Sequence, residues 1–122
     1  MIEPSVCGVY SVDTSDVLTH RSQKYCVCVS VSLGKYLLIN TIHRKIYDDF
    51  KIRASDYGFL QGTDRFLSCS VFFDFDPPKL KQKVGVLSSA DTKTVIEKIM
   101  ASRTIAAMDK DIVLAELQKT LR

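Results

Sequence analysis

Residues 25–40 read YCVCVSVSLGKYLLIN, and this stretch decides the fold. Side chains alternate between the two faces of a strand, so Tyr25 and the valines of residues 25–32 share one face, while the cysteines and serines share the other. Leu33 and Gly34 form a turn signal, and residues 35–40 are typical of a return strand. We therefore predict a β-hairpin whose valine face points to the core and whose face of small residues lies close under another segment.

Four more segments have the composition of strands. They are residues 5–12, 50–54, 64–75 and 83–87. The segment 64–75 (DRFLSCSVFFDF) gives the strongest strand signal, and Asp76-Pro77-Pro78 must end it because proline cannot continue a ladder. The polar residues 13–24 predict a long loop, and residues 41–49 predict an irregular basic connection.

After residue 87 the hydrophobic periodicity changes from that of strands to that of helices. Ser88 or Ser89 can cap a helix over residues 90–102, and Asp109 can cap a second helix over residues 110–121. We expect both helices to pack on the sheet or on each other. Their apolar stripes consist of Val95, Ile96, Ile99 and Met100 in the first helix and of Val113, Leu114, Leu117 and Leu121 in the second.

Length and composition suit one globular domain spanning residues 1–122, since 46% of the residues are hydrophobic and 25% are charged. Strands that follow one another through short turns favour an antiparallel sheet. Short strands in this number, all before residue 88, tend to curl into a small barrel. The predicted fold is therefore mainly β with C-terminal helices (α+β), built on a small antiparallel barrel.

The net charge of +3 argues against a domain that holds nucleic acid by charge alone, but it suits an RNA enzyme with a few basic residues at one cleft. The sequence has no apolar run that predicts a membrane span, and its first residues lack the pattern of a secretion signal. We therefore expect a cytoplasmic protein without membrane contact, whose four cysteines are reduced. Cys26 and Cys28 are interpreted as buried core thiols, with a metal site as the less favoured alternative.

Polar residues gather in three segments that the predicted strands can bring together. RNA cleavage without a metal needs a base for the 2′-hydroxyl, an acid for the leaving 5′-oxygen and a cation for the phosphate. Histidine, arginine and a hydroxyl group supply this chemistry. The candidates are His20 and Arg21 in the long loop, Thr41, His43 and Arg44 after the hairpin, and Arg65 and Ser68 on the strongest strand.

Each candidate also has a plain structural interpretation. His20 and Arg21 fit a solvated loop, residues 43–45 fit an exposed basic turn, and Asp64 with Arg65 fits a local ion pair. The chain has two histidines, and both lie in polar segments rather than apolar runs, which favours a functional role slightly. The sequence carries none of the motifs for nucleotide phosphates, zinc proteases or serine hydrolases.

Three features in chain order resemble the PemK/MazF-like toxin family. A first strand with residues 8–10 (GVY) precedes a long polar loop with His20-Arg21. The valine-rich hairpin ends in residues 39–41 (INT), similar to the family's hydrophobic strand that closes on a threonine. The third feature comprises residues 59–60 (FL), residues 64–70 (DRFLSCS), which look like the strand with a polar pair in divergent members, and Leu87, which leads into a C-terminal helix.

This resemblance implies an SH3-like barrel, a homodimer and metal-independent cleavage of single-stranded RNA without a cofactor. It also implies an antitoxin protein as the neutralising partner. Arg21 would then stabilise the phosphate charge, His20 or His43 would transfer protons, and Thr41 would hold a phosphate oxygen. The implied RNA-binding residues are Arg44, Lys45, Arg65 and Ser68.

A second interpretation is a non-catalytic protein-binding module on the same fold, such as a phage or plasmid accessory protein. The modest net charge favours it, and so does Arg21, which is followed by Ser22 where the toxin family has proline. A third interpretation is a thiol or metal site at Cys26 and Cys28.

Overall fold

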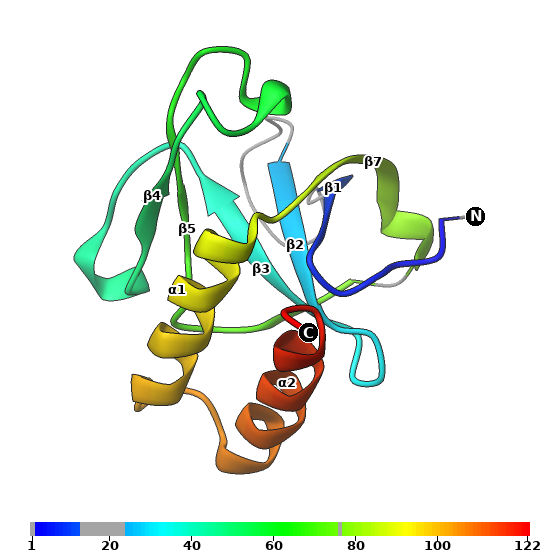
Figure 1. The fold of residues 1–122 in the computed structure, drawn as a ribbon, viewed down its shortest axis with the longest axis vertical. Coiled ribbons are helices and arrows are strands. Elements are labelled where there is room, and N and C mark those ends of the chain that lie inside the picture. Colours follow the sequence, from blue (N-terminus) through cyan, green and yellow to red (C-terminus); the bar gives the residue numbers. More distant parts are fainter. Residues whose placement is uncertain (1, 13–23, 76) are drawn as a thin grey trace.

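The computed structural model describes residues 2–12, 24–75 and 77–122 (Figure 1). Except for Lys24, the predicted loop of residues 13–24 lies outside the described residues, and so does Asp76. The strands are β1 (Gly8–Val12), β2 (Lys24–Ser30), β3 (Lys35–Asn40), β4 (Phe50–Ile52), β5 (Arg65–Leu67), β6 (Phe73–Asp74) and β7 (Leu80–Val86). The helices are the short 3-10 helices η1 (Lys45–Tyr47), η2 (Gly58–Leu60) and η3 (Pro77–Lys79), followed by α1 (Ser89–Ala101) and α2 (Ala107–Lys119).

The described strands form an antiparallel sheet in the order β4-β5-β3-β2-β1-β7, and β6 pairs with the first residues of β3. The predicted hairpin is confirmed, because β2 and β3 pair in a register that puts Tyr25 opposite Ile39. A register shift after Cys28 disturbs the ladder, and β2 ends at Ser30, two residues earlier than expected. The fold class is the predicted one, mainly antiparallel β with two C-terminal helices.

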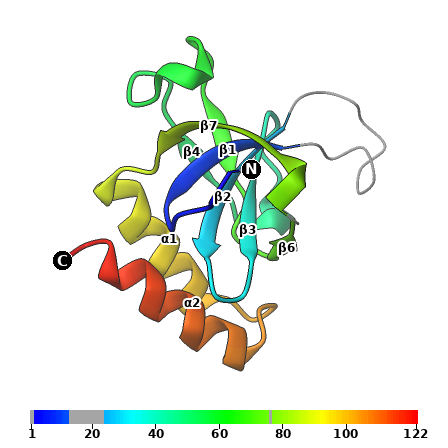
Figure 2. The same ribbon diagram turned by 90° about the vertical axis from the view of Figure 1, so that its right-hand side faces the viewer.

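Both α-helices pack on the same face of the sheet (Figure 2). The valine face of the hairpin points into this core, as predicted, although Val31 is 49% exposed because it lies in the turn after β2. Burial of each aliphatic side chain stabilises the fold by about 1.5–3 kcal/mol, so this layer dominates stability. Its fully buried members include Val27, Val29, Leu37 and Ile39 from the hairpin, Val95 and Ile99 from α1, and Val113 and Leu117 from α2.

The opposite face of the hairpin carries a smaller core. Cys26 and Cys28 are completely buried there, in one core with Phe75, which follows β6, and Leu80, the first residue of β7. The expectation that the face of small residues lies close under another segment is therefore confirmed. Burial, together with nearby ionisable groups, raises the pKa of both thiols to about 12, so they stay protonated at neutral pH.

The segment 64–75, expected as one strand, is divided into β5 and β6. Both pair with β3, but residues 68–72 lie between them, while β3 offers only Leu37 and Leu38 over the same stretch. The surplus residues bulge away from the ladder, although the Ser68 N–H still donates to the Leu38 carbonyl (2.9 Å). Strand propensity cannot reveal this mismatch, because it arises from the register with a distant strand.

The other element boundaries shift by a few residues. β1 begins at Gly8 rather than residue 5, and β4 ends at Ile52 rather than residue 54. β7 begins at Leu80 rather than residue 83, because its early residues pair with the far end of β1. α1 has the predicted cap, since the Ser88 hydroxyl accepts a hydrogen bond from the Asp91 N–H. Within its apolar stripe, only Met100 is exposed.

α2 begins at Ala107, three residues before the predicted start, and its N-cap Ala106 makes no side-chain cap hydrogen bond. Asp109 lies inside the first turn instead of capping it. A carboxylate in the first turn still interacts favourably with the helix dipole. Asp109 therefore indicates correctly that a helix begins nearby, but the predicted first residue of that helix is wrong.

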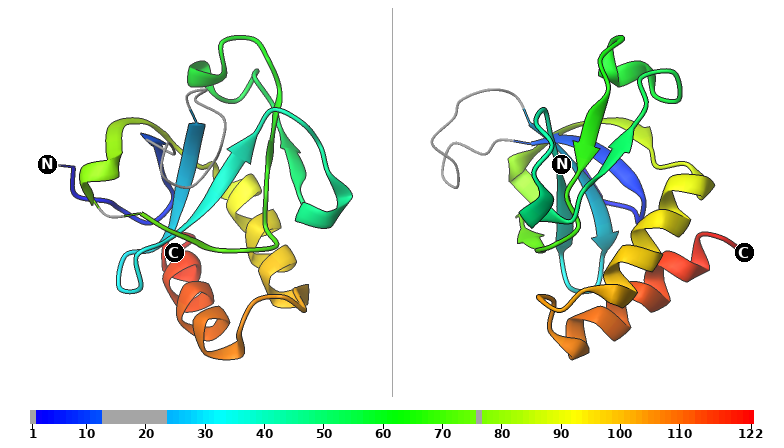
Figure 3. Two further views of the ribbon diagram at one scale, coloured as in Figure 1. Left: turned by 180° about the vertical axis from the view of Figure 1, so that it is seen from behind. Right: turned by 90° about the vertical axis from the view of Figure 1, so that its left-hand side faces the viewer.

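The segment between β4 and β5 folds back towards the other end of the sheet, far from the α1–α2 connection (Figure 3). The Phe59 ring lies against Gly85 of β7. The Tyr57 hydroxyl donates to the Asp91 carboxylate (2.5 Å) and accepts from the Ser88 N–H (3.0 Å). Side chains from this segment therefore connect the β4 end of the sheet to β7 and α1. Among the described residues, no helix is both long and apolar enough for a membrane span.

Candidate functional site

Four side chains form a row across the end of the sheet where β1 ends and β2 begins. Lys24 pairs with Val12 of β1, and its ammonium donates to the Asn40 side-chain oxygen (3.4 Å). Asn40 is opposite Phe66 of β5, which in turn is opposite Lys51 of β4. Directly opposed residues project to the same face of a sheet. We call Lys24, Asn40, Phe66 and Lys51 the cross-strand row.

His43 and Asp49 form a hydrogen-bonded pair beside this row. The Asp49 carboxylate is buried and lies 2.5 Å from His43 Nδ1, while its other oxygen accepts from the Arg44 N–H (3.0 Å). The His43 ring is 59% exposed and stacks at a tilt on Phe66, with ring centroids 5.4 Å apart. When Nδ1–H of a neutral imidazole donates to a carboxylate, Nε2 is left as the proton acceptor. The pair therefore presents a positioned general base to solvent.

Lys24, at the β2 end of the row, has the charge of a second cation, Arg65, nearby, although Arg65 pairs with Ile52 and projects to the other face of the sheet. Burial lowers the pKa of Lys24, and the nearby positive charge of Arg65 lowers it further. The Arg65 guanidinium stacks on Tyr25, 5.3 Å from the ring centroid, and its Nε finds no hydrogen-bond acceptor within the described residues. A lysine with a lowered pKa combines positive charge with easier proton donation, and both properties suit a site that binds phosphate.

The predicted site residues divide into three groups by position. Thr41, His43, Arg44 and Lys45 are exposed on the connection that follows β3, next to the row. Arg65 lies at the start of β5 and reaches Tyr25 and Lys24. His20 and Arg21 lie outside the described residues. The segment that carries them joins Val12 to Lys24, and these two residues pair at the end of the sheet where the row lies.

Ser68 has a different environment from the other candidates. It is 3% exposed, and its hydroxyl donates to the Tyr47 carbonyl at 3.5 Å. This contact links the bulge after β5 to η1. A role in RNA binding therefore stays a sequence-based prediction for Ser68, and we leave it out of the site proposed below.

The sequence alone does not identify Lys24 and Asp49 as members of the candidate site. For Lys24, a cation just before the valine-rich strand is a usable signal, because it pairs with the end of the preceding strand. No signal existed for Asp49, because its pairing with His43 depends on how the 41–49 connection folds. Among the residues that the structure describes, no cluster of three or more His, Cys, Asp or Glu side chains is placed to hold a metal ion.

Comparison of the chain with protein-family models finds no match, and a search among curated proteins also finds none.

Proposed function

We propose that this protein is a PemK/MazF-like toxin with an SH3-like barrel, a metal-independent endoribonuclease that cleaves single-stranded RNA. The observation that carries the proposal is the His43–Asp49 pair, whose imidazole ring stacks on Phe66 within the cross-strand row that Lys24 begins. A base held by a buried carboxylate and a phosphate-binding cation are two of the three parts that RNA cleavage requires.

The proposed reaction assigns these residues the following steps. His43 Nε2 takes the proton of a ribose 2′-hydroxyl, and the oxygen forms a bond to the adjacent phosphorus. The bond from phosphorus to the 5′-oxygen breaks, and Lys24 or a water molecule protonates that leaving oxygen. The products are a 2′,3′-cyclic phosphate and a 5′-hydroxyl end. Lys24 offsets the charge that develops on the phosphate, and the Thr41 hydroxyl donates to one of its oxygens. Arg65 adds positive potential from the other face of β5, where it pairs with Ile52 and stacks on Tyr25.

The sequence-based role of Arg21 stays part of this proposal as a further cation for the phosphate. The toxin proposal also includes a homodimer and an antitoxin protein that neutralises the activity. Expression in bacteria is then expected to arrest growth, whereas expression of His43→Ala is expected to leave growth normal.

The direct test uses the purified protein with single-stranded RNA in EDTA, with the fragment ends identified by mass spectrometry. His43→Ala is expected to lower the cleavage rate by about 100-fold or more, because it removes the base. Asp49→Asn is expected to lower it by about tenfold or more, because the amide misorients the ring. His20→Ala is the matched control, since it replaces the other histidine of the chain. Loss of cleavage in His20→Ala but not in His43→Ala would show that the site is wrongly assigned.

A protein-binding module is the second candidate function. Ile42 and Ile46 flank His43 in sequence and expose 62% and 77% of their surfaces. Exposed apolar side chains on a polar connection are typical of contacts with a protein partner. This function predicts that no RNA is cleaved and that Ile42→Ser with Ile46→Ser abolishes capture of a partner in a pull-down.

A further inference from the structure

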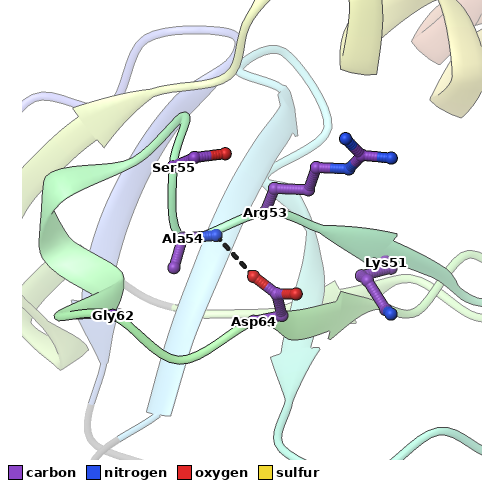
Figure 4. Close-up of a pocket in the computed structure, with 6 residues that line it drawn as sticks. All are labelled: Lys51, Arg53, Ala54, Ser55, Gly62 and Asp64. Carbon is purple, nitrogen blue, oxygen red and sulfur yellow. Dashed lines mark hydrogen bonds between the residues drawn. The ribbon is translucent and has the colours of Figure 1, made fainter.

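A pocket of about 570 Å³ lies between β4, β5 and the loop that joins them (Figure 4). Two of its lining residues are joined by a hydrogen bond, in which the Ala54 N–H donates to the Asp64 carboxylate (2.8 Å). The six residues that line it are Lys51, Arg53, Ala54, Ser55, Gly62 and Asp64.

The pocket is suited to an anion. Lys51 and Arg53 come from the strand side of the pocket, with their charged ends pointing apart, and Ser55 lies on the loop side (Figure 4). Both cationic residues are exposed, and they outnumber the single carboxylate of Asp64, so the lining carries an excess of positive charge. An arginine fork and a lysine ammonium are the usual ligands of a phosphate.

Gly62 keeps one wall of the pocket open. Its φ of +83° lies in the left-handed region, which glycine adopts without strain, and a Cβ at this position would meet no atom within 4 Å. A ligand can therefore approach the backbone here without displacing a side chain.

The pocket is continuous with the proposed cleavage site. Lys51 belongs both to the pocket and to the cross-strand row, where it pairs with Phe66. Asp64 precedes Phe66 by two residues, which is about 7 Å along a strand. One extended strand of RNA can therefore contact the row and the pocket together, and the Phe66 ring within the row offers a surface for a base.

We infer that this pocket is a second phosphate subsite, in which Lys51 and Arg53 bind a phosphodiester of the same RNA strand next to the cleaved one. The inference rests on the proposed function and deepens it, because it makes the substrate a strand longer than the two nucleotides that flank the cleaved bond. A single-stranded substrate is favoured because the row and the pocket lie on one face of the sheet, where one extended strand can contact both.

The test measures binding of 2′-O-methyl RNA by fluorescence anisotropy, since a blocked 2′-oxygen prevents cleavage. For an RNA of about eight nucleotides, Lys51→Gln with Arg53→Gln is expected to weaken binding by about tenfold. The slope of log affinity against log salt is expected to become shallower by about 0.7 for each phosphate that the variant no longer neutralises. A trinucleotide is expected to lose much less affinity, because it does not fill both sites. Lys93→Gln with Lys119→Gln removes the same charge from the helices and is expected to have little effect.

The outcomes separate this inference from the proposed function. If wild-type protein cleaves RNA and the Lys51/Arg53 variant binds the longer RNA as tightly as wild type, the subsite is wrong while the nuclease stands. If the variant loses affinity as expected but unmodified RNA is never cleaved, the subsite stands and the nuclease is wrong. Failure of every form to bind the longer RNA overturns the subsite, and it leaves a protein partner as the occupant to test.

Discussion

At Gly8 the backbone passes directly against the ring of Tyr10. A Cβ at this position would lie 2.5 Å from the Tyr10 hydroxyl oxygen and 2.8 Å from two ring carbons. Tyr10 has no room to move, because it is completely buried and its hydroxyl accepts a hydrogen bond from the Ser5 N–H (2.8 Å). Gly8 is therefore required by packing, although its φ is not in the left-handed region.

We expect Gly8→Ala to lower the free energy of unfolding by about 1–3 kcal/mol, as overpacking of a core does. Gly58→Ala is the matched control, since a Cβ there meets no atom within 4 Å. The control is expected to leave stability unchanged or to raise it by up to about 1 kcal/mol, because alanine restricts the unfolded chain. Urea unfolding of both variants measures the difference. If Gly8→Ala were as stable as wild type, Tyr10 would have to accommodate the extra methyl group, and packing would not require glycine here.

Single residues also show how far the sequence leads towards a site. His43 and Thr41 were predictable because a polar connection after an apolar strand exposes its side chains. The pairing of His43 with Asp49 was not predictable, because no regular element spaces those two residues. Lys24 acquires its role only through the register that places it beside Asn40.

At the scale of elements, the Glu116 carboxylate of α2 forms hydrogen bonds with the turn of the β2–β3 hairpin. The two oxygens of Glu116 accept from the hydroxyls of Ser30 and Ser32 and from the N–H groups of Val31 and Ser32. Burial acts to raise the pKa of Glu116, but these hydrogen bonds outweigh it and hold the pKa below its ordinary value. The helix is therefore attached to the hairpin by charge-assisted hydrogen bonds as well as by Val113 and Leu117.

Glu116→Gln is expected to lower the free energy of unfolding at pH 7 by about 1 kcal/mol, a value reduced from that of buried charged hydrogen bonds because the group is partly solvated. A carboxylate with a lowered folded pKa stabilises above its unfolded pKa, and this contribution is lost as the pH falls through the folded pKa. The gap between wild type and variant should therefore close in acid. Urea unfolding from pH 7 to about pH 3 tests this, with the exposed Glu97→Gln as control. A gap that stays constant over this range would contradict the role assigned to Glu116.

The elements also differ in how well the sequence defined them. Alternation over residues 25–40 gave the hairpin and its buried face, and Ser88 marked the start of α1. The segment 64–75 was misjudged because every residue in it favours a strand, while the break after Leu67 depends on how few residues β3 offers for pairing. Local propensity determines which segments form strands, and distant pairing determines where the strands end.

At the scale of the whole molecule, the two ends of the sheet are connected by contacts that no local pattern encodes. The strand order places β4 and β7 at opposite ends of the described sheet. Phe59 and Tyr57 connect those ends through Gly85 and the start of α1. The antiparallel sheet and the two helices were predictable from the order of periodicities, whereas this connection joins residues about thirty positions apart in the sequence.

Tyr57→Phe tests this connection by removing only the hydroxyl. Tyr57 is 6% exposed, and the variant leaves the Ser88 N–H and the Asp91 carboxylate without this partner. We expect the free energy of unfolding to fall by about 1–3 kcal/mol.

The effect of Tyr57→Phe also depends on pH. Burial, and then the hydrogen bond to Asp91, raise the pKa of Tyr57 to about 12. Since the neutral hydroxyl is favoured in the folded state, its contribution is complete below the unfolded pKa of about 10 and is lost as the pH rises towards 12. Urea unfolding of both proteins between about pH 7 and pH 11 should show the gap narrowing, and hydrogen exchange should show faster opening of residues 53–64 in the variant. A gap that stays constant with pH, with unchanged exchange in that segment, would mean that the Phe59 contact alone holds the two ends of the sheet together.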